Sequence, residues 1–147
     1  MLERKIIHAT LVQVEKKGVL LTGKSASGKS DLALRLIENK KAKLVADDVV
    51  EVCVQNGKLS GCAPKSIAGL LEVRNIGVVR YPYLSSANVD IIVALKESPE
   101  DIQRMPLRQK ELILGLEINK IDLYAKENSA PEKIVAALRW FEQNQTD

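Results

Sequence analysis

The pattern of apolar and polar positions divides the first part of the chain into two strands and a helix. Residues 6–14 and 18–22 are apolar, β-branched runs separated by the charged residues 15–17, which predicts a β-hairpin. After a glycine-rich segment, apolar residues recur at helical spacing up to about Lys40. We therefore expect the order strand, strand, loop and helix.

Further apolar runs predict the rest of the sheet. We expect strands at 43–46, 49–54, 89–95 and 116–124. The run at 89–95 is the most continuous and is expected to be a central strand. Between these strands the pattern indicates a turn at 55–57, a helical turn within 63–70, and a loop with a short helix over 99–112.

The last expected element is a helix that begins at a capping box. Ser129 and Glu132 have the spacing at which two side chains cap a helix N-terminus. Apolar residues then mark one helical face as far as Phe141, so we interpret this helix as structural.

Composition and charge narrow the function classes. With 147 residues and 46% hydrophobic content, the chain suits a single domain over residues 1–147. The net charge of +3 is small and dispersed and does not indicate nucleic-acid binding. There is no long apolar run for a signal peptide or membrane span, so we expect a cytoplasmic protein. The two cysteines lack the spacing of zinc ligands and are expected to be free thiols.

The strongest motif is the octet GKSASGKS, which fits G-x-x-x-x-G-K-[ST]. Small residues let backbone N–H groups surround a phosphate, while the lysine reaches the β/γ-phosphates and the hydroxyl holds Mg²⁺. The residues expected to bind the nucleotide are Gly23, Lys24, Ser25, Ala26, Ser27, Gly28, Lys29 and Ser30. An ordinary Gly/Ser turn is the alternative, but the flanking strand and helix favour a phosphate-binding loop.

Two adjacent carboxylates follow the expected strand at 43–46. Asp47 and Asp48 come seventeen and eighteen residues after Ser30, where a Walker-B-type acid would project towards a nucleotide. An acidic turn is the alternative interpretation. Together with the phosphate-loop motif, a role in phosphoryl transfer is favoured.

These motifs occur in an order that resembles the catalytic domain of HPr kinase/phosphorylase, which phosphorylates a serine of the phosphocarrier protein HPr. The matching segments are IHATLV at 7–12, GKSASGKSDLALRLIE at 23–38, LVADDVVE at 44–51, LLEVRNIGVV at 70–79 and SAPEKI at 129–134. The resemblance is greatest to the short form without a separate N-terminal domain. It implies an α/β fold, a P-loop kinase domain of the HPr kinase/PEP carboxykinase-like type with a mixed sheet flanked by helices.

The resemblance also implies roles for individual residues. Lys29 and the loop would bind the phosphates of ATP, and Ser30 with Glu72 would lie at Mg²⁺. Asp47 matches the catalytic acid that takes the proton from the attacking serine, and it would return this proton during phosphorolysis. Asp48 and His8 match further active-site positions, with His8 near the catalytic acid. The implied partner is an HPr-like phosphocarrier of the phosphotransferase system, and longer relatives form hexamers.

Two positions and one segment depart from the longer relatives. Ala26 and Asn75 stand where glycine is usual, and the segment 124–130 lacks an arginine that contributes to catalysis in those enzymes. Lys126 lies in that segment but cannot make the bidentate contacts of an arginine. Phosphorolysis is therefore the less supported direction of the reaction.

Two other functions remain open at this point. The first is a P-loop kinase of small molecules or nucleotides, although Arg104 and Arg108 are the only close arginine pair in a plausible lid region. The second is a non-catalytic regulator that binds a nucleotide. Such a regulator would be expected to lack Lys29, Ser30 or Asp47, and all three residues are present.

Overall fold

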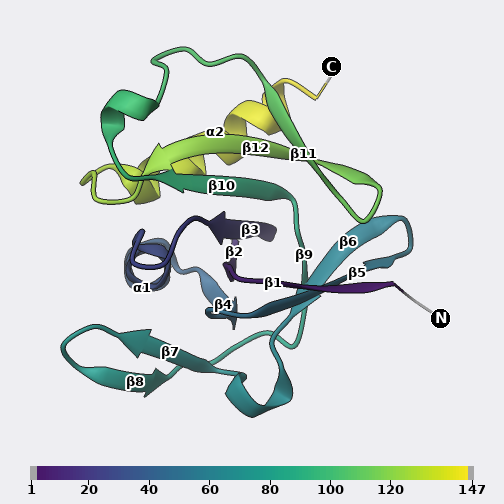
Figure 1. Cartoon of the computed structure of the whole chain (residues 1–147), viewed down its shortest axis with the longest axis vertical. Coiled ribbons are helices and arrows are strands. Elements are labelled where there is room, and N and C mark those ends of the chain that lie inside the picture. Colours follow the sequence, from purple (N-terminus) through teal and green to yellow (C-terminus); the bar gives the residue numbers. More distant parts are fainter. Residues whose placement is uncertain (1–2, 146–147) are drawn as a thin grey trace.

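The computed structural model describes residues 3–145, which form three β-sheets and two α-helices (Figure 1). The helices are α1 (Lys29–Lys40) and α2 (Ala130–Gln143), with short 3-10 helices at Lys65–Ile67 and Pro99–Asp101. The strands are β1 (Arg4–Ile7), β2 (Thr10–Val14), β3 (Lys17–Thr22), β4 (Lys43–Ala46), β5 (Val50–Gln55), β6 (Lys58–Cys62), β7 (Leu70–Val73), β8 (Gly77–Arg80), β9 (Ala87–Asn88), β10 (Ile91–Lys96), β11 (Gln109–Ile113) and β12 (Leu116–Tyr124).

The largest sheet determines where a ligand can bind. Its six strands have the order β11-β12-β10-β3-β2-β4. The neighbours β12, β10 and β3 are parallel, whereas β11, β2 and β4 pair antiparallel to their neighbours. The carboxyl ends of β3, β10 and β12 therefore meet at one edge, the edge at which α/β sheets bind ligands. The central position predicted for the 89–95 run is confirmed by β10.

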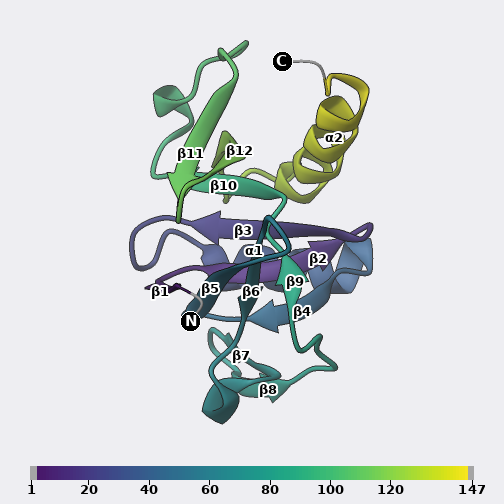
Figure 2. The ribbon, with the colours of Figure 1, turned by 90° about the vertical axis from the view of Figure 1, so that its right-hand side faces the viewer.

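The helices lie on one face of this sheet and the four-stranded sheet lies on the other (Figure 2). A cluster of buried apolar residues fills the space on each face. Val19 and Leu21 of β3 pack with the apolar face of α1 and α2. Leu20, between them, packs on the opposite face with residues of the four-stranded sheet β1-β5-β6-β9. Successive strand residues point to opposite faces, so this continuous apolar run is buried on both sides. Burial of each such leucine contributes about 1.5–3 kcal/mol.

The predicted N-terminal hairpin is confirmed, but its first strand is shorter than expected. β2 and β3 pair antiparallel around Glu15 and Lys16, whose φ values are +48° and +68°, as a two-residue hairpin turn requires. The prediction of one strand over 6–14 is wrong, because the chain leaves the strand conformation at His8 and Ala9. β1 pairs with β5 in the second sheet instead.

Other differences lie in segments with weak patterns. The segment around Gly77 forms the hairpin β7–β8, with Asn75 in a left-handed conformation at φ +74°, which asparagine adopts more readily than most residues. β11 occupies part of 99–112, where only a loop and a short helix were expected. Ser129 is the N-cap of α2 but its side chain makes no capping hydrogen bond, so the predicted capping box does not form.

Two expectations from composition can be compared with residues 3–145. Cys53 and Cys62 are both free thiols, as expected. Within the same residues, neither helix has the length and apolar character needed to cross a membrane.

Candidate active site

The glycine-rich octet forms a loop between β3 and the first turn of α1. Gly23 and Gly28 have φ values of +149° and +101°, which residues other than glycine rarely adopt. A Cβ atom on Gly28 would lie 3.1 Å from the Cβ of Ala125, just after β12. The predicted order of strand, phosphate loop and helix is confirmed, and the loop rests against the ends of parallel strands.

The atoms inside this loop suit the binding of phosphates. The Lys29 ammonium donates hydrogen bonds to the carbonyl oxygens of Gly23 (2.9 Å) and Lys24 (3.0 Å), so it already lies across the loop. The Ser27 hydroxyl is buried and has no hydrogen-bond partner among the described residues. A flexible cation, an unsatisfied hydroxyl and a glycine cradle at a helix N-terminus fit an anionic phosphate group.

Ala26 has a left-handed backbone conformation at φ +64°. Ala26 stands where glycine is usual in the longer relatives, and its positive φ is the conformation that favours glycine. A non-glycine residue in this conformation is strained by about 1–2 kcal/mol. The departure from glycine at position 26 therefore leaves local strain in the loop.

Asp47 links the loop to the sheet. Its side chain is buried, and its Oδ1 accepts hydrogen bonds from the hydroxyls of Ser30 (2.7 Å) and Thr10 (2.9 Å). Its Oδ2 accepts one longer bond, 3.4 Å, from the backbone N–H of Glu72. Oδ1 is thus held in place by two hydroxyls, whereas Oδ2 remains the better placed oxygen for another donor.

Thr10 is a residue of the candidate site that was not singled out from the sequence. It is fully buried at the start of β2, and its hydroxyl supports Asp47. A threonine beginning an apolar strand is common, because β-branched residues favour strands. Only the antiparallel pairing of β2 with β4, which brings Thr10 beside the residue after β4, reveals its contact with Asp47.

Three further predicted site residues lie near the buried pair of Asp47 and Thr10 and have exposed side chains: Asp48, His8 and Glu72. Asp48 has a left-handed conformation at φ +70°, and its carbonyl accepts a 3.3 Å hydrogen bond from the N–H of Ala9, which places His8 at the same corner. Within residues 3–145, no hydrogen bond or ion pair joins His8 to Asp47. The roles of these three side chains stay predictions.

The predicted metal ligands, Ser30 and Glu72, both lie next to Asp47 through the contacts described above. In the described part of the chain, no three His, Cys, Asp or Glu side chains form a group that could hold a metal by themselves. Mg²⁺ is commonly bound through one or two protein oxygens together with substrate phosphates and water. The oxygen donors present fit that mode of binding.

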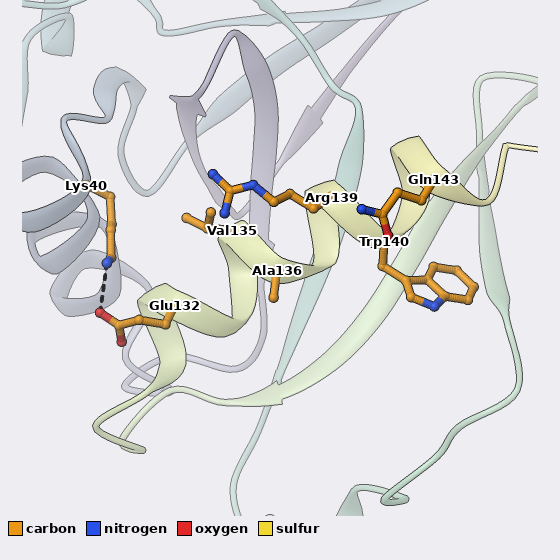
Figure 3. Close-up of a pocket in the computed structure, with 7 residues that line it drawn as sticks. All are labelled: Lys40, Glu132, Val135, Ala136, Arg139, Trp140 and Gln143. Carbon is orange, nitrogen blue, oxygen red and sulfur yellow. Dashed lines mark ion pairs between the residues drawn. The ribbon is translucent and has the colours of Figure 1, made fainter.

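A hollow of about 360 Å³ lies along α2 (Figure 3). Its lining includes Lys40 and Glu132, which form a 2.9 Å ion pair, together with the half-exposed Trp140. The hydrogen bond from Lys40 lowers the pKa of the Glu132 carboxyl. Arg139, which also lines the hollow, pairs with Glu15 at 3.1 Å. Since no residue of the phosphate loop lines this hollow and its cations are paired, it does not belong to the candidate active site.

Comparison with known proteins gives the family. The model of the HPr serine kinase C-terminal domain matches residues 1–146. HPr kinase/phosphorylase of Thermoanaerobacter sp. (strain X514) is 41% identical over 103 residues, which are 65% of this chain and 33% of the relative. The enzyme of the same name from Clostridium tetani is 35% identical over 127 residues, which are 80% of this chain and 41% of the relative. The chain thus spans about a third to two fifths of these relatives' length.

A solved structure extends the similarity to the fold. The structure of the Hpr(Ser) kinase/phosphatase from Coxiella burnetii has a TM-score of 0.85 and 28% sequence identity, and the match covers 96% of this chain and 92% of that one. The predicted mixed α/β fold of this kinase type is confirmed by this match. The chain belongs to the HPr serine kinase C-terminal domain family.

Proposed function

We propose that this protein is an ATP- and Mg²⁺-dependent protein serine kinase whose acceptor is an HPr-like phosphocarrier, and that residues 1–147 act as one cytoplasmic kinase domain. The observation that carries the proposal is the 2.7 Å hydrogen bond between Ser30 of the phosphate loop and Asp47. It places a buried carboxylate beside the group that would bind the metal and phosphates, as phosphoryl transfer requires.

Asp47 would act as the general base. A serine hydroxyl is a weak nucleophile at neutral pH, and a positioned carboxylate can accept its proton during attack. The Oδ2 atom of Asp47 is the candidate acceptor, because Thr10 and Ser30 already occupy Oδ1. In the reverse reaction, the same carboxyl would return this proton to the serine oxygen.

The phosphate loop would supply the positive charge. Lys29 would exchange its bonds to the carbonyls of Gly23 and Lys24 for contacts with the phosphates, and the backbone N–H groups of the loop would bind phosphate oxygens. Ser30 and Glu72 would hold Mg²⁺, which offsets charge on the transferred group when bound. Phosphorolysis and assembly into a hexamer stay predictions from the resemblance.

The test is transfer of label from γ-labelled ATP to purified HPr-like phosphocarriers, followed by identification of the labelled amino acid. We expect phosphoserine, with the label abolished in Lys29→Ala and Asp47→Asn. Inorganic phosphate added afterwards measures phosphorolysis. Label on small alcohols or nucleotides without a protein acceptor would favour a small-molecule kinase, and ATP binding without any transfer would favour a regulator.

A further inference from the structure

Arg35 makes contacts that the proposed chemistry does not use. Its guanidinium, half-buried on α1, donates hydrogen bonds to three backbone carbonyls, those of Ala125 (2.5 Å), Glu127 (2.6 Å) and Asn128 (3.2 Å). These carbonyls belong to residues 125–129, the segment between β12 and α2, which we call the 125–129 loop. One side chain of the helix that follows the phosphate loop therefore fixes the path of this second loop.

A second contact anchors the same loop from α2. Lys133 donates to both carboxylate oxygens of Glu127, at 2.5 Å and 2.7 Å. The loop thus has one anchor on its backbone and another on a side chain. Ala125 is buried, whereas Lys126 and Asn128 are exposed. A loop held at both points keeps a defined shape while presenting polar groups to solvent.

The 125–129 loop borders the phosphate loop. The closest approach is between Ala125 and Gly28, where an added Cβ would meet the Ala125 methyl group at 3.1 Å. In the sheet, β12 lies two strands from β3 on one side, while β4 lies two strands from β3 on the other. Asp47 and the 125–129 loop are therefore on opposite flanks of the phosphate loop.

The geometry of phosphoryl transfer indicates which part of the substrates would lie on each flank. The attacking oxygen and the leaving oxygen lie roughly in line, on opposite sides of the transferred phosphoryl group. The attacking serine would be on the flank of Asp47, where the general base lies. The leaving nucleoside diphosphate must then extend to the opposite flank, over the ends of β10 and β12.

We infer that the 125–129 loop forms a wall of the site for the base and ribose of the nucleotide, and that Arg35 is the positioning residue that keeps this wall in place. The inference rests on the proposed function, because it takes its ligand and its direction of transfer from it. Arg35 itself acts through the loop, since the three hydrogen bonds that it makes within residues 3–145 all go to backbone carbonyls of that segment.

The experiment compares two ligands that differ only by the nucleoside. Affinities for ADP and for inorganic pyrophosphate, each with Mg²⁺, are measured by calorimetry on the full chain of the wild type, Arg35→Met and Arg35→Lys. Arg139→Met is the matched control, because its ion pair with Glu15 lies away from both loops. Thermal unfolding of each variant is recorded alongside.

We expect Arg35→Met to weaken ADP binding about tenfold or more, because the loop loses its charged hydrogen bonds. Pyrophosphate affinity is expected to stay within about twofold of the wild type. Arg35→Lys is expected to fall between the two, and Arg139→Met to match the wild type. Equal losses for ADP and pyrophosphate, or no loss for ADP, would overturn the inference.

Hydrogen exchange of the wild type provides a test that needs no variant. ADP is expected to slow exchange of the amides of residues 126–129, and pyrophosphate is expected to leave them unchanged. Equal protection by both ligands, or by neither, would contradict the inference. ADP binding that shows this pattern without transfer to any protein would overturn the proposed kinase activity and leave the nucleoside wall standing.

Discussion

The two flanks of the phosphate loop are held by different kinds of contact. On the β4 flank, side chains bond to one another, with Asp47 as the shared acceptor for Ser30 and Thr10. On the β12 flank, Arg35 donates its three hydrogen bonds within residues 3–145 to backbone carbonyls. The first flank therefore depends on the identity of its side chains, whereas the second depends mainly on the path of the loop backbone, with the Lys133–Glu127 ion pair as a second anchor.

This difference suggests a division of function. A buried carboxylate with defined hydroxyl donors is suited to proton transfer, because its geometry is fixed before the substrate arrives. A loop fixed through its backbone can bind the part of a substrate that does not react, where position matters more than side-chain chemistry. Substitutions on the two flanks are expected to separate transfer from nucleotide affinity.

The largest effect on phosphoryl transfer is expected in the phosphate loop, which lies between the two flanks. Lys29→Met removes the cation that lies across the loop, so ADP and pyrophosphate affinities should fall together and transfer should drop about 10²–10³-fold. Transfer rates and calorimetry on the same preparations measure both. Lys58→Met, at an exposed position in the second sheet, is the control. Unchanged transfer by Lys29→Met would show that the phosphate loop does not take part in the reaction.

The next effect tests the β4 flank alone. Thr10→Val removes a hydroxyl donor to the buried Asp47 carboxylate, so the free energy of unfolding should fall by about 1–3 kcal/mol. Transfer should slow by about tenfold, while ADP affinity changes little. Denaturant unfolding and steady-state kinetics provide the measurements. Thr10→Ser, which keeps the hydroxyl, should recover most of both losses; equal losses in the two variants would show that the hydrogen bond is not the cause.

A smaller effect concerns the loop between the flanks. Ala26→Gly should relieve the strain at φ +64° and raise the free energy of unfolding by about 0.5–1 kcal/mol, after allowing for the greater chain entropy of glycine. Ala136→Gly, at an exposed position on α2, should instead lower it by about 1 kcal/mol. A loss of stability in both variants would contradict the argument from strain.

The smallest effect lies outside both flanks, at the ion pair between α1 and α2. The pKa of Glu132 is lower in the folded state because of the hydrogen bond from Lys40. The ionised carboxylate therefore stabilises the fold above its unfolded pKa of about 4.3, and this stabilisation disappears as the pH falls through the lower folded value. Glu132→Gln should be slightly less stable than the wild type at pH 7 and equal to it in acid.

Denaturant unfolding at several pH values measures this small difference. Glu142→Gln is the control, because Glu142 is exposed on the same helix and has no ion pair among residues 3–145. A difference for Glu132→Gln that persists in acid would point to packing rather than charge.

The β4 flank was largely predictable from the sequence, because its chemistry depends on residue types that form recognisable motifs. The octet at 23–30 and the two aspartates after a strand can be recognised by their spacing in the sequence. In the structure, a hydrogen bond joins Ser30 to Asp47. Thr10 was the member that was missed, since its contact with Asp47 arises from the pairing of β2 with β4 and leaves no local pattern.

The β12 flank could not be predicted in the same way. Every residue has a backbone carbonyl, so nothing in the sequence of residues 125–129 identifies them as partners of Arg35. Arg35 itself fits the polar face of an amphipathic helix. Likewise, the break at His8 depends on the pairing of β1 with β5, a distant segment, which overrides local propensity. β11 pairs with the next strand, β12, through the two-residue turn Leu114–Gly115.

The most direct test of the central claim is a comparison of Asp47→Asn with the wild type, measuring both phosphoryl transfer to an HPr-like phosphocarrier and the affinity for ADP. The account predicts that transfer falls about 10²–10⁴-fold, the usual contribution of a general base, while ADP affinity stays within a few-fold. Transfer that persists in Asp47→Asn would show that another group accepts the proton, and would contradict the division of the site into a reacting flank and a binding flank.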